Sequence, residues 1–178
     1  MDYSETLVDR LNAYNGLITN TTLDRVVLQN GAHSLREVVE HPGGVTIIPI
    51  DDEGYVYCVR QFRYPMGEHL LEVPAGKLEQ GENPLECAIR ELSEETGITA
   101  TEYIDLGCIY PSPGFCKEII YIYMAKGLTP GIAHPDVNEF LDVEKIHLDE
   151  LVELIMKNKL ADAKTIIAVL KAKNVLNA

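Results

Sequence analysis

The chain has 178 residues, of which 46% are hydrophobic, and this suits one globular domain with a sizeable core. Its formal net charge of -13 at pH 7 argues against nucleic-acid or anionic-membrane binding, since those surfaces repel an acidic protein and no basic run offsets the field. The polar, acidic start, the lack of an apolar stretch of membrane-spanning length and four scattered cysteines predict a soluble, cytoplasmic protein with reduced thiols.

The N-terminal residues predict an antiparallel β-ribbon. Residues 7–12 favour a weak helical or coil lead-in, whereas residues 18–41 form short apolar runs with turns at Gly16 and Asn30–Gly31. Such a ribbon buries little of its own surface, so it requires a partner surface from the rest of the chain or from a second copy. We therefore expect a single domain, 1–178, that consists of a ribbon (1–42) and a core (43–178).

Two strands, residues 45–49 and 55–61, open the predicted core. Arg60 and Arg63 stand at the end of the second strand, and their planar guanidinium groups suit bidentate contact with phosphate or carboxylate. Surface ion pairs at a solvated strand edge explain these two residues equally well. Glu72 interrupts an apolar run, so it is either a ligand-contacting acid or an ion-pair partner of one of the two arginines.

A helix with clear start and stop signals follows. Asn83 is a good N-cap, Pro84 suits the first helical position and Gly97 supplies a left-handed end, so the helix is predicted from Pro84 to Thr96. At about 100° per residue, an apolar stripe faces the core and the carboxylates gather on another side. The stripe comprises Leu85, Ala88, Ile89 and Leu92, and the carboxylates are Glu91, Glu94 and Glu95.

Glu91 and Glu95 lie one helical turn apart and direct oxygen atoms at one point, which suits a hard cation such as Mg²⁺ or Mn²⁺. A solvated acidic face is the ordinary interpretation of such a helix. Without a counter-ion, however, like charges at this spacing destabilise the helix, and the dipole disfavours anions near its C-terminus. These unfavourable terms, together with the glycine-containing loop before the helix, favour a metal site.

Nine positions of this region match the box G-x5-E-x7-R-E-U-x-E-E-x-G-U of the Nudix hydrolases, where U is aliphatic, without a gap. The matching residues are Gly76, Glu82, Arg90, Glu91, Leu92, Glu94, Glu95, Gly97 and Ile98. The chain therefore resembles that family, and from about Arg36 to Glu139 it resembles the ADP-ribose pyrophosphatases. This resemblance implies hydrolysis of a nucleoside diphosphate linked to another group, with Mg²⁺ or Mn²⁺ held by glutamates of the box.

The resemblance also implies roles for individual residues. The implied metal ligands are Glu91, Glu94, Glu95 and the carbonyl group of Ala75. Glu94 also counts among the implied catalytic residues, and Arg90 and Glu82 brace the loop and the helix. Arg60, Arg63 and Glu72 are expected at the substrate. In the resembling subfamily the N-terminal ribbon helps to form a homodimer, so we expect the same assembly here.

Strands predicted at residues 103–111 and 118–126 flank the sequence PSPGFCKE. A lone Pro-Gly pair predicts an ordinary turn. Pro113, however, stands sixteen residues after Gly97, where the ADP-ribose subfamily carries its marker proline. The resemblance therefore assigns Pro113, Gly114 and Phe115 to substrate binding. Cys116 and Lys117 depart from the small or acidic residues common in relatives, and this departure leaves the contacts to the distal ribose undefined.

Residues 128–139 are polar and contain two prolines and one glycine, so they predict a mobile loop. Relatives carry a catalytic glutamate in this loop. Glu139 matches it best and Asp136 is the second candidate, whereas His134 is more typical of a surface residue than of a catalytic base.

The chain ends with a predicted strand, 140–146, and two amphipathic helices within 148–176, separated around residues 158–162. The expected core residues here include Leu151, Val169 and Leu170. The overall expectation is an α+β Nudix fold, in which a mixed, curved sheet lies between the box helix and the C-terminal helices and the N-terminal ribbon is appended. The arrangement of layers comes from the resemblance, because the order of elements alone permits several α+β folds.

The expected activity is metal-dependent cleavage of the pyrophosphate of ADP-ribose, or of a related nucleotide sugar, to AMP and ribose 5-phosphate. A Nudix hydrolase for a different nucleotide sugar or a dinucleotide would share every metal ligand. A non-catalytic nucleotide-binding module is a further alternative, disfavoured because such modules usually lose box glutamates and none is lost here.

Overall fold

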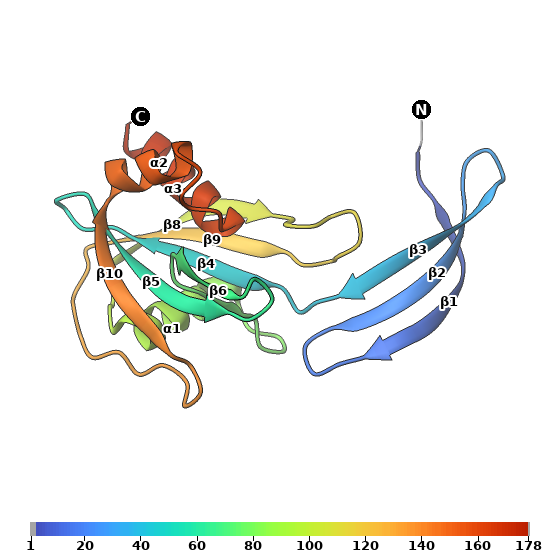
Figure 1. The fold of residues 1–178 in the computed structure, drawn as a ribbon, viewed down its shortest axis with the longest axis horizontal. Helices are drawn as coiled ribbons and strands as arrows, with labels where there is room; N and C mark the ends of the chain where they lie inside the picture. Colours follow the sequence, from blue (N-terminus) through green and yellow to red (C-terminus); the bar gives the residue numbers. More distant parts are fainter. Residues whose placement is uncertain (1–2, 178) are drawn as a thin grey trace. The chain divides into compact units, whose positions relative to one another are not determined.

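The computed structural model describes residues 3–177, which pack into two compact units (Figure 1). One unit holds the residues up to 43 together with residues 110–119, and the other holds residues 44–109 and those from 120 onward. No helix in the described residues is long and apolar enough to cross a bilayer.

The first unit contains an antiparallel sheet in the order β1-β2-β3. Its strands are β1 (Thr6–Asn15), β2 (Asn20–Val27) and β3 (His33–Glu40). The chain reverses where the Gly16 N–H donates to the Thr19 carbonyl at 2.9 Å, and again at Gly31, whose φ of 79° favours glycine. The predicted antiparallel ribbon and both of its turns are therefore confirmed, with a third strand added.

The helical or coil lead-in expected at residues 7–12 is wrong, because these residues lie in β1. Every residue of β1 is exposed, so the alternation of buried and exposed side chains that marks a strand in a sequence is missing. The strand is held instead by its pairing with β2. Arg10 stands opposite Asp24 of β2, and its guanidinium group donates hydrogen bonds of 2.8 and 2.6 Å to the two carboxylate oxygens.

The second unit contains two sheets. One has the order β7-β4-β9-β8 and is mixed, because β4 and β9 run parallel, and the other is antiparallel in the order β10-β5-β6. The strands are β4 (Gly44–Pro49), β5 (Tyr55–Arg63), β6 (Glu68–Glu72), β7 (Ala75–Lys77), β8 (Glu102–Ile109), β9 (Ile120–Lys126) and β10 (Leu141–His147). The helices are α1 (Pro84–Thr96), α2 (Leu148–Met156) and α3 (Ala163–Leu176).

The mixed sheet separates two apolar cores. Figure 1 shows α1 on one side of the sheet and α2 and α3 on the other. On one face Leu92 of α1 packs with Val45 and Ile47 of β4. On the other face Val169 of α3 packs with Ile48 of β4, whose side chain points away from that of Ile47 because neighbouring strand residues alternate between faces. The expected α+β arrangement, with the box helix on one side and the C-terminal helices on the other, is confirmed.

Helix α1 has the predicted bounds and caps. The Asn83 side chain accepts a hydrogen bond of 2.9 Å from the Leu85 N–H, and Gly97 ends the helix with a φ of 70°. Its buried face, however, is rotated from the expected one. Ile89 is 37% exposed, and the buried residues include Cys87, Ala88, Glu91, Leu92 and Glu95. The prediction that these carboxylates lie away from the apolar stripe is therefore wrong for Glu91 and Glu95.

Candidate active site

Glu95 is a fully buried carboxylate with one oxygen atom left free of hydrogen bonds. Its Oε2 atom accepts a hydrogen bond of 3.1 Å from the Ala75 N–H, whereas Oε1 has no partner among the described residues. Burial raises the pKa of Glu95 to about 8, the Ala75 N–H opposes this shift, and the nearby charges of Glu139 and Glu91 add to it. A buried, unpaired oxygen of this kind suits a cation ligand.

Glu91 lies one turn before Glu95 on the same buried face and is 9% exposed. Burial raises its pKa, against the opposing effect of Arg90. Its carboxylate lies against the backbone of Gly76 in β7. A Cβ atom at position 76 would stand 1.8 Å from Glu91 Oε1, far closer than two atoms can approach, so only glycine leaves room for this carboxylate.

Arg90 connects the box helix to the loop before it. Its Nε atom donates to Glu82 at 2.9 Å, and its Nη1 atom donates to Glu91 at 2.7 Å and to Glu94 at 2.9 Å. The hydrogen bond from Arg90 lowers the pKa of Glu82 to about 2, and the same bond is the main cause of the raised Arg90 pKa. Glu82 also accepts a hydrogen bond from the backbone N–H of Glu79, which fixes the loop itself.

The 128–139 loop lies against α1. The negative charge of Glu139 raises the pKa of both Glu91 and Glu95, which places this glutamate within electrostatic reach of them. The loop is held against α1 by the His134 N–H, which donates to the carbonyl of Glu94 at 2.9 Å. The side chains of His134 and Asp136 are exposed.

Arg63 and Arg60 occupy different surroundings. Arg63 donates two hydrogen bonds of 2.7 Å to the carboxylate of Glu72, one from Nε and one from Nη2, and the charge of Glu95 contributes to its raised pKa. Arg60 is paired instead with Glu144 of β10. The two arginines stand three residues apart on a regular strand, so they point to opposite faces. Glu72 was expected either to contact the ligand or to pair with one of the two arginines, and in the structure it pairs with Arg63.

Glu72 also binds Lys164, a residue that was not among the predicted site residues. The Lys164 ammonium group donates to Glu72 and, at 3.0 Å, to Asp162, and the side chains of Glu72 and Lys164 are only 1% and 12% exposed. Burial pushes the pKa of Glu72 upward, but its bonds to Arg63 and Lys164 outweigh burial and leave the pKa lowered. Asp162 is the N-cap of the following helix, and an aspartate just before an apolar helical run is a sequence signal that could have drawn attention to this region.

We expect Glu72→Gln to lower the free energy of unfolding by about 3 kcal/mol at pH 7, because it leaves the buried Lys164 and the partly exposed Arg63 without the buried carboxylate that pairs with both. The pKa of Glu72 is lower in the folded chain than in the unfolded one, so its contribution is complete above the unfolded value and disappears as pH falls through the folded value. The difference between wild type and variant should therefore shrink in acid. Urea unfolding at pH 7 and pH 3 measures it.

Glu144→Gln is the matched control, because it removes the partner of Arg60 from a pair whose side chains are 38% and 34% exposed. We expect it to lower the free energy of unfolding by less than about 1 kcal/mol. Equal losses for the two variants would contradict the assignment of Glu72 as the buried centre of the network.

The residues predicted to contact the second ribose lie in the first unit. Pro113, Gly114 and Phe115 are exposed and belong to a turn in which the N–H groups of Phe115 and Cys116 donate to the Ser112 carbonyl. The turn is joined to β3, since the Val39 N–H donates to the Phe115 carbonyl at 2.7 Å. Their part in substrate binding stays a prediction.

The donor set around Glu95 fits a hard divalent cation by its chemistry, since it offers carboxylate oxygens, one of them buried and unpaired. As arranged in residues 3–177, no three His, Cys, Asp or Glu side chains converge closely enough to form a metal site. Arg90 holds Glu91 and Glu94 by hydrogen bonds, so a cation would compete with its guanidinium group for both carboxylates.

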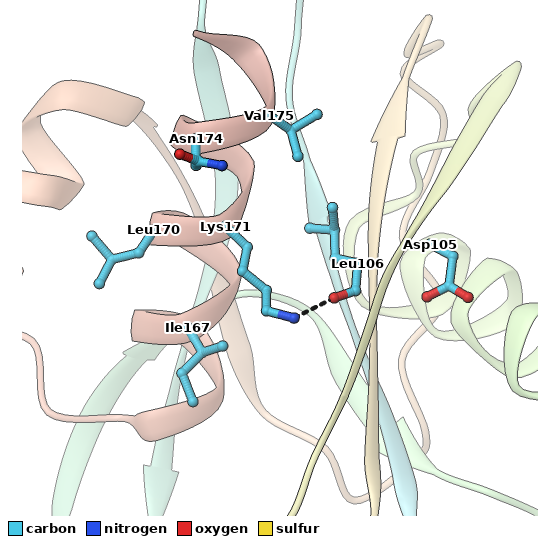
Figure 2. Close-up of a pocket in the computed structure, with 7 residues that line it drawn as sticks. All are labelled: Asp105, Leu106, Ile167, Leu170, Lys171, Asn174 and Val175. Atoms are coloured by element: carbon cyan, nitrogen blue, oxygen red, sulfur yellow. Dashed lines mark hydrogen bonds between the residues drawn. The ribbon is translucent and has the colours of Figure 1, made fainter. Parts of the chain in front are cut away.

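A groove of about 530 Å³ lies between α3 and β8, and Figure 2 shows the residues that line it. Lys171 crosses one side of it and donates to the Leu106 carbonyl (Figure 2). Leu170 was expected in the core, but it is 41% exposed and lines this groove instead. Because α3 and α1 cover opposite faces of the mixed sheet, the groove is separate from the carboxylates of α1.

Comparison with known proteins shows the family to which the chain belongs. The NUDIX domain matches residues 18–169, so the chain belongs to the Nudix family and is a Nudix hydrolase. It is 40% identical to the methanol dehydrogenase activator of Bacillus methanolicus, over 94% of this chain and 91% of that protein. It is 37% identical to the ADP-ribose pyrophosphatase of Bacillus subtilis (strain 168), over 98% and 96% of the two chains.

The fold also has a close structural counterpart. The crystal structure of an ADP compounds hydrolase superimposes with a TM-score of 0.86 and covers 97% of this chain and 94% of its own, at 21% sequence identity. At that identity the likeness confirms the Nudix fold and leaves the substrate to be argued from the site.

Proposed function

We propose that this protein hydrolyses the pyrophosphate bond of ADP-ribose, or of a related nucleoside-diphosphate sugar, with the help of Mg²⁺ or Mn²⁺. From ADP-ribose the products would be AMP and ribose 5-phosphate. The observation that carries the proposal is the buried pair of carboxylates on α1, with Glu95 Oε1 unpaired and Glu91 seated on Gly76. The similarity to an ADP-ribose pyrophosphatase over almost the whole chain supports the choice of substrate.

Glu91, Glu94, Glu95 and the Ala75 carbonyl would hold the cation. When bound, a divalent cation neutralises the charge of the pyrophosphate and makes a water molecule more acidic. Glu139, which lies within electrostatic reach of Glu91 and Glu95, would orient or deprotonate the attacking water.

The cationic residues would steady the phosphates and the site. Arg63 donates from Nε and Nη2 to Glu72, which fixes the orientation of the guanidinium group. Its Nη1 atom would donate to a phosphate oxygen. Arg60 points to the opposite face of β5 and is bound by Glu144 of β10, so the contact with a phosphate that was expected for it would require this pair to open. Arg90 and Glu82 would keep the loop and the helix in register and take no direct part in the reaction.

A panel of hydrolysis assays tests the substrate. The purified protein with Mg²⁺ should show a higher kcat/KM for ADP-ribose than for other nucleotide sugars and dinucleotides, and chelation of the metal should remove the activity. A higher kcat/KM for a dinucleotide would favour the alternative Nudix substrate class. Nucleotide binding without turnover of any compound would favour a binding module.

A second candidate function is activation of a dehydrogenase, which the similarity to the methanol dehydrogenase activator favours. Assays with the purified protein, with and without an added dehydrogenase, distinguish the two functions. Hydrolysis of free ADP-ribose supports the first function. Faster turnover of an added dehydrogenase, without hydrolysis of free nucleotide sugars, supports the second.

Pro113→Gly is expected to lower kcat/KM for ADP-ribose by about tenfold, because ordering each freed loop residue costs about 1–2 kcal/mol. A poorer substrate that does not use this loop should change little, so the measured quantity is the ratio of the two kcat/KM values. Equal losses for all substrates would mean that Pro113 only supports the fold.

We further propose that the protein is a homodimer in which the ribbon contributes to the interface. Strand β1 is exposed throughout and presents Leu7, Val8, Leu11 and Tyr14, and apolar side chains on an edge strand favour a partner. Sedimentation at micromolar concentration should give a dimer for the wild type and more monomer for Leu11→Asp. A folded, active wild-type monomer would contradict this assembly.

A further inference from the structure

The first turn of α3 holds the backbone that leads into the active site. The Val73 N–H, in the short link between β6 and β7, donates to the hydroxyl of Thr165 at 3.0 Å. Thr165 is fully buried, and its hydroxyl in turn donates to Asp162 at 2.5 Å. Asp162 is the N-cap of α3 and also accepts from the Thr165 N–H at 3.0 Å. The helix cap and the link are therefore one hydrogen-bonded unit.

The carbonyl group of Pro74, the second residue of the link, is fixed as well. The Pro74 carbonyl accepts from the Ile47 N–H at 2.9 Å and from the Thr46 hydroxyl at 3.1 Å. One residue later the Ala75 N–H donates to Glu95 Oε2 at 3.1 Å. Val73 is therefore bound to Thr165, and Ala75, two residues further along the chain, is bound to the buried carboxylate of Glu95.

The same turn of α3 also holds the side chain of Glu72, the last residue of β6. Lys164 donates to Glu72 and to Asp162, so residues 162, 164 and 165 together bind both the side chain of Glu72 and the backbone of Val73. The bonds of Lys164 to Glu72 and of Val73 to Thr165 each join positions 92 residues apart in the chain. Asp162, Lys164 and Thr165 all lie outside the Nudix box.

We propose that Asp162, Lys164 and Thr165 are positioning residues, which set the Ala75 N–H and carbonyl and, through them, the carboxylate of Glu95. This inference rests on the proposed function, because it assigns them to the metal-binding centre of that reaction. Residues that orient a ligand commonly alter metal affinity or activity 10–100-fold when changed. A threonine whose hydroxyl only filled the core would have no such effect.

Thr165→Val tests the proposal, because it keeps the shape of the side chain and removes the hydroxyl. Thr165→Ser is the matched control, because it keeps the hydroxyl and removes a methyl group. In the metal-free protein, amide hydrogen exchange at Val73 and Ala75 should be faster in Thr165→Val than in Thr165→Ser. A Mn²⁺ titration should show a Kd about tenfold higher for Thr165→Val, and within about twofold of wild type for Thr165→Ser.

Equal Mn²⁺ Kd values and equal Ala75 exchange in the two variants would overturn the proposal, even if Thr165→Val melts at a lower temperature. If Thr165→Val does not fold, Lys164→Met and Lys164→Arg take the same measurements, with the weaker Mn²⁺ binding expected for Lys164→Met. Neither readout uses a nucleotide. A wild-type protein that hydrolyses no nucleotide therefore contradicts the proposed function, while the comparison of variants still decides the positioning role.

Discussion

Glu95→Gln should lower kcat by at least about a hundredfold, because it removes a charged ligand from the proposed metal centre. Substitution of residues that only orient metal ligands already lowers metal affinity or activity by about 10–100-fold. The fold should survive. Gln retains an oxygen for the Ala75 N–H and, as a neutral group, avoids the cost that burial and the charge of Glu91 impose on a carboxylate here, so the metal-free free energy of unfolding should stay equal or rise. Steady-state kinetics at saturating Mg²⁺ and urea unfolding without metal measure the two quantities.

Glu86→Gln is the control, because it makes the same substitution on the exposed first turn of the same helix. It should leave kcat unchanged. Activity retained by Glu95→Gln at saturating Mg²⁺ would contradict the metal role. A large loss of metal-free stability would show instead that Glu95 is a structural residue.

Gly76→Ala should also lower activity, with little loss of stability. The added Cβ atom would collide with the end of the Glu91 side chain, which is flexible and moves away more easily than β7 does. The carboxylate would then leave the position in which it faces Glu95 on the buried side of α1. We expect kcat/KM to fall by at least about tenfold, in the range seen when ligand-orienting contacts are lost.

A double-mutant cycle isolates this effect. If Gly76→Ala acts only by displacing Glu91, it should add no further loss in a Glu91→Gln background. Full additivity of the two losses would mean that the alanine distorts β7 or the loop before α1 instead.

The sequence was most informative where a feature depends on neighbouring residues. The caps Asn83 and Gly97 fix both ends of α1, and the box residues identify the family, because each depends on short spacing in the chain. Strand β1 was missed since none of its side chains is buried and its pattern comes from pairing with β2. Ile89 was misplaced because the helix turns Glu91 and Glu95 toward the interior.

Contacts between distant residues could not be predicted from the sequence. Lys164 and Glu72 are 92 positions apart, and Arg60 and Glu144 are 84 apart, so only the folded topology brings each pair together. Nothing in the local pattern distinguished Arg63, which lies near Glu95, from Arg60, which faces β10. The burial of the active-site carboxylates could not be predicted from the sequence either, since a helix with grouped glutamates ordinarily predicts a solvated face.

The most direct test of the proposed function is ³¹P NMR of ADP-ribose incubated with the protein and Mg²⁺ in water enriched in ¹⁸O. We predict that the two diphosphate signals give way to two phosphomonoester signals, those of AMP and ribose 5-phosphate. One product should carry the isotope shift of a single ¹⁸O atom taken from water. Unchanged diphosphate signals, under conditions in which the protein is folded and binds the metal, would contradict the assignment of these carboxylates to pyrophosphate hydrolysis.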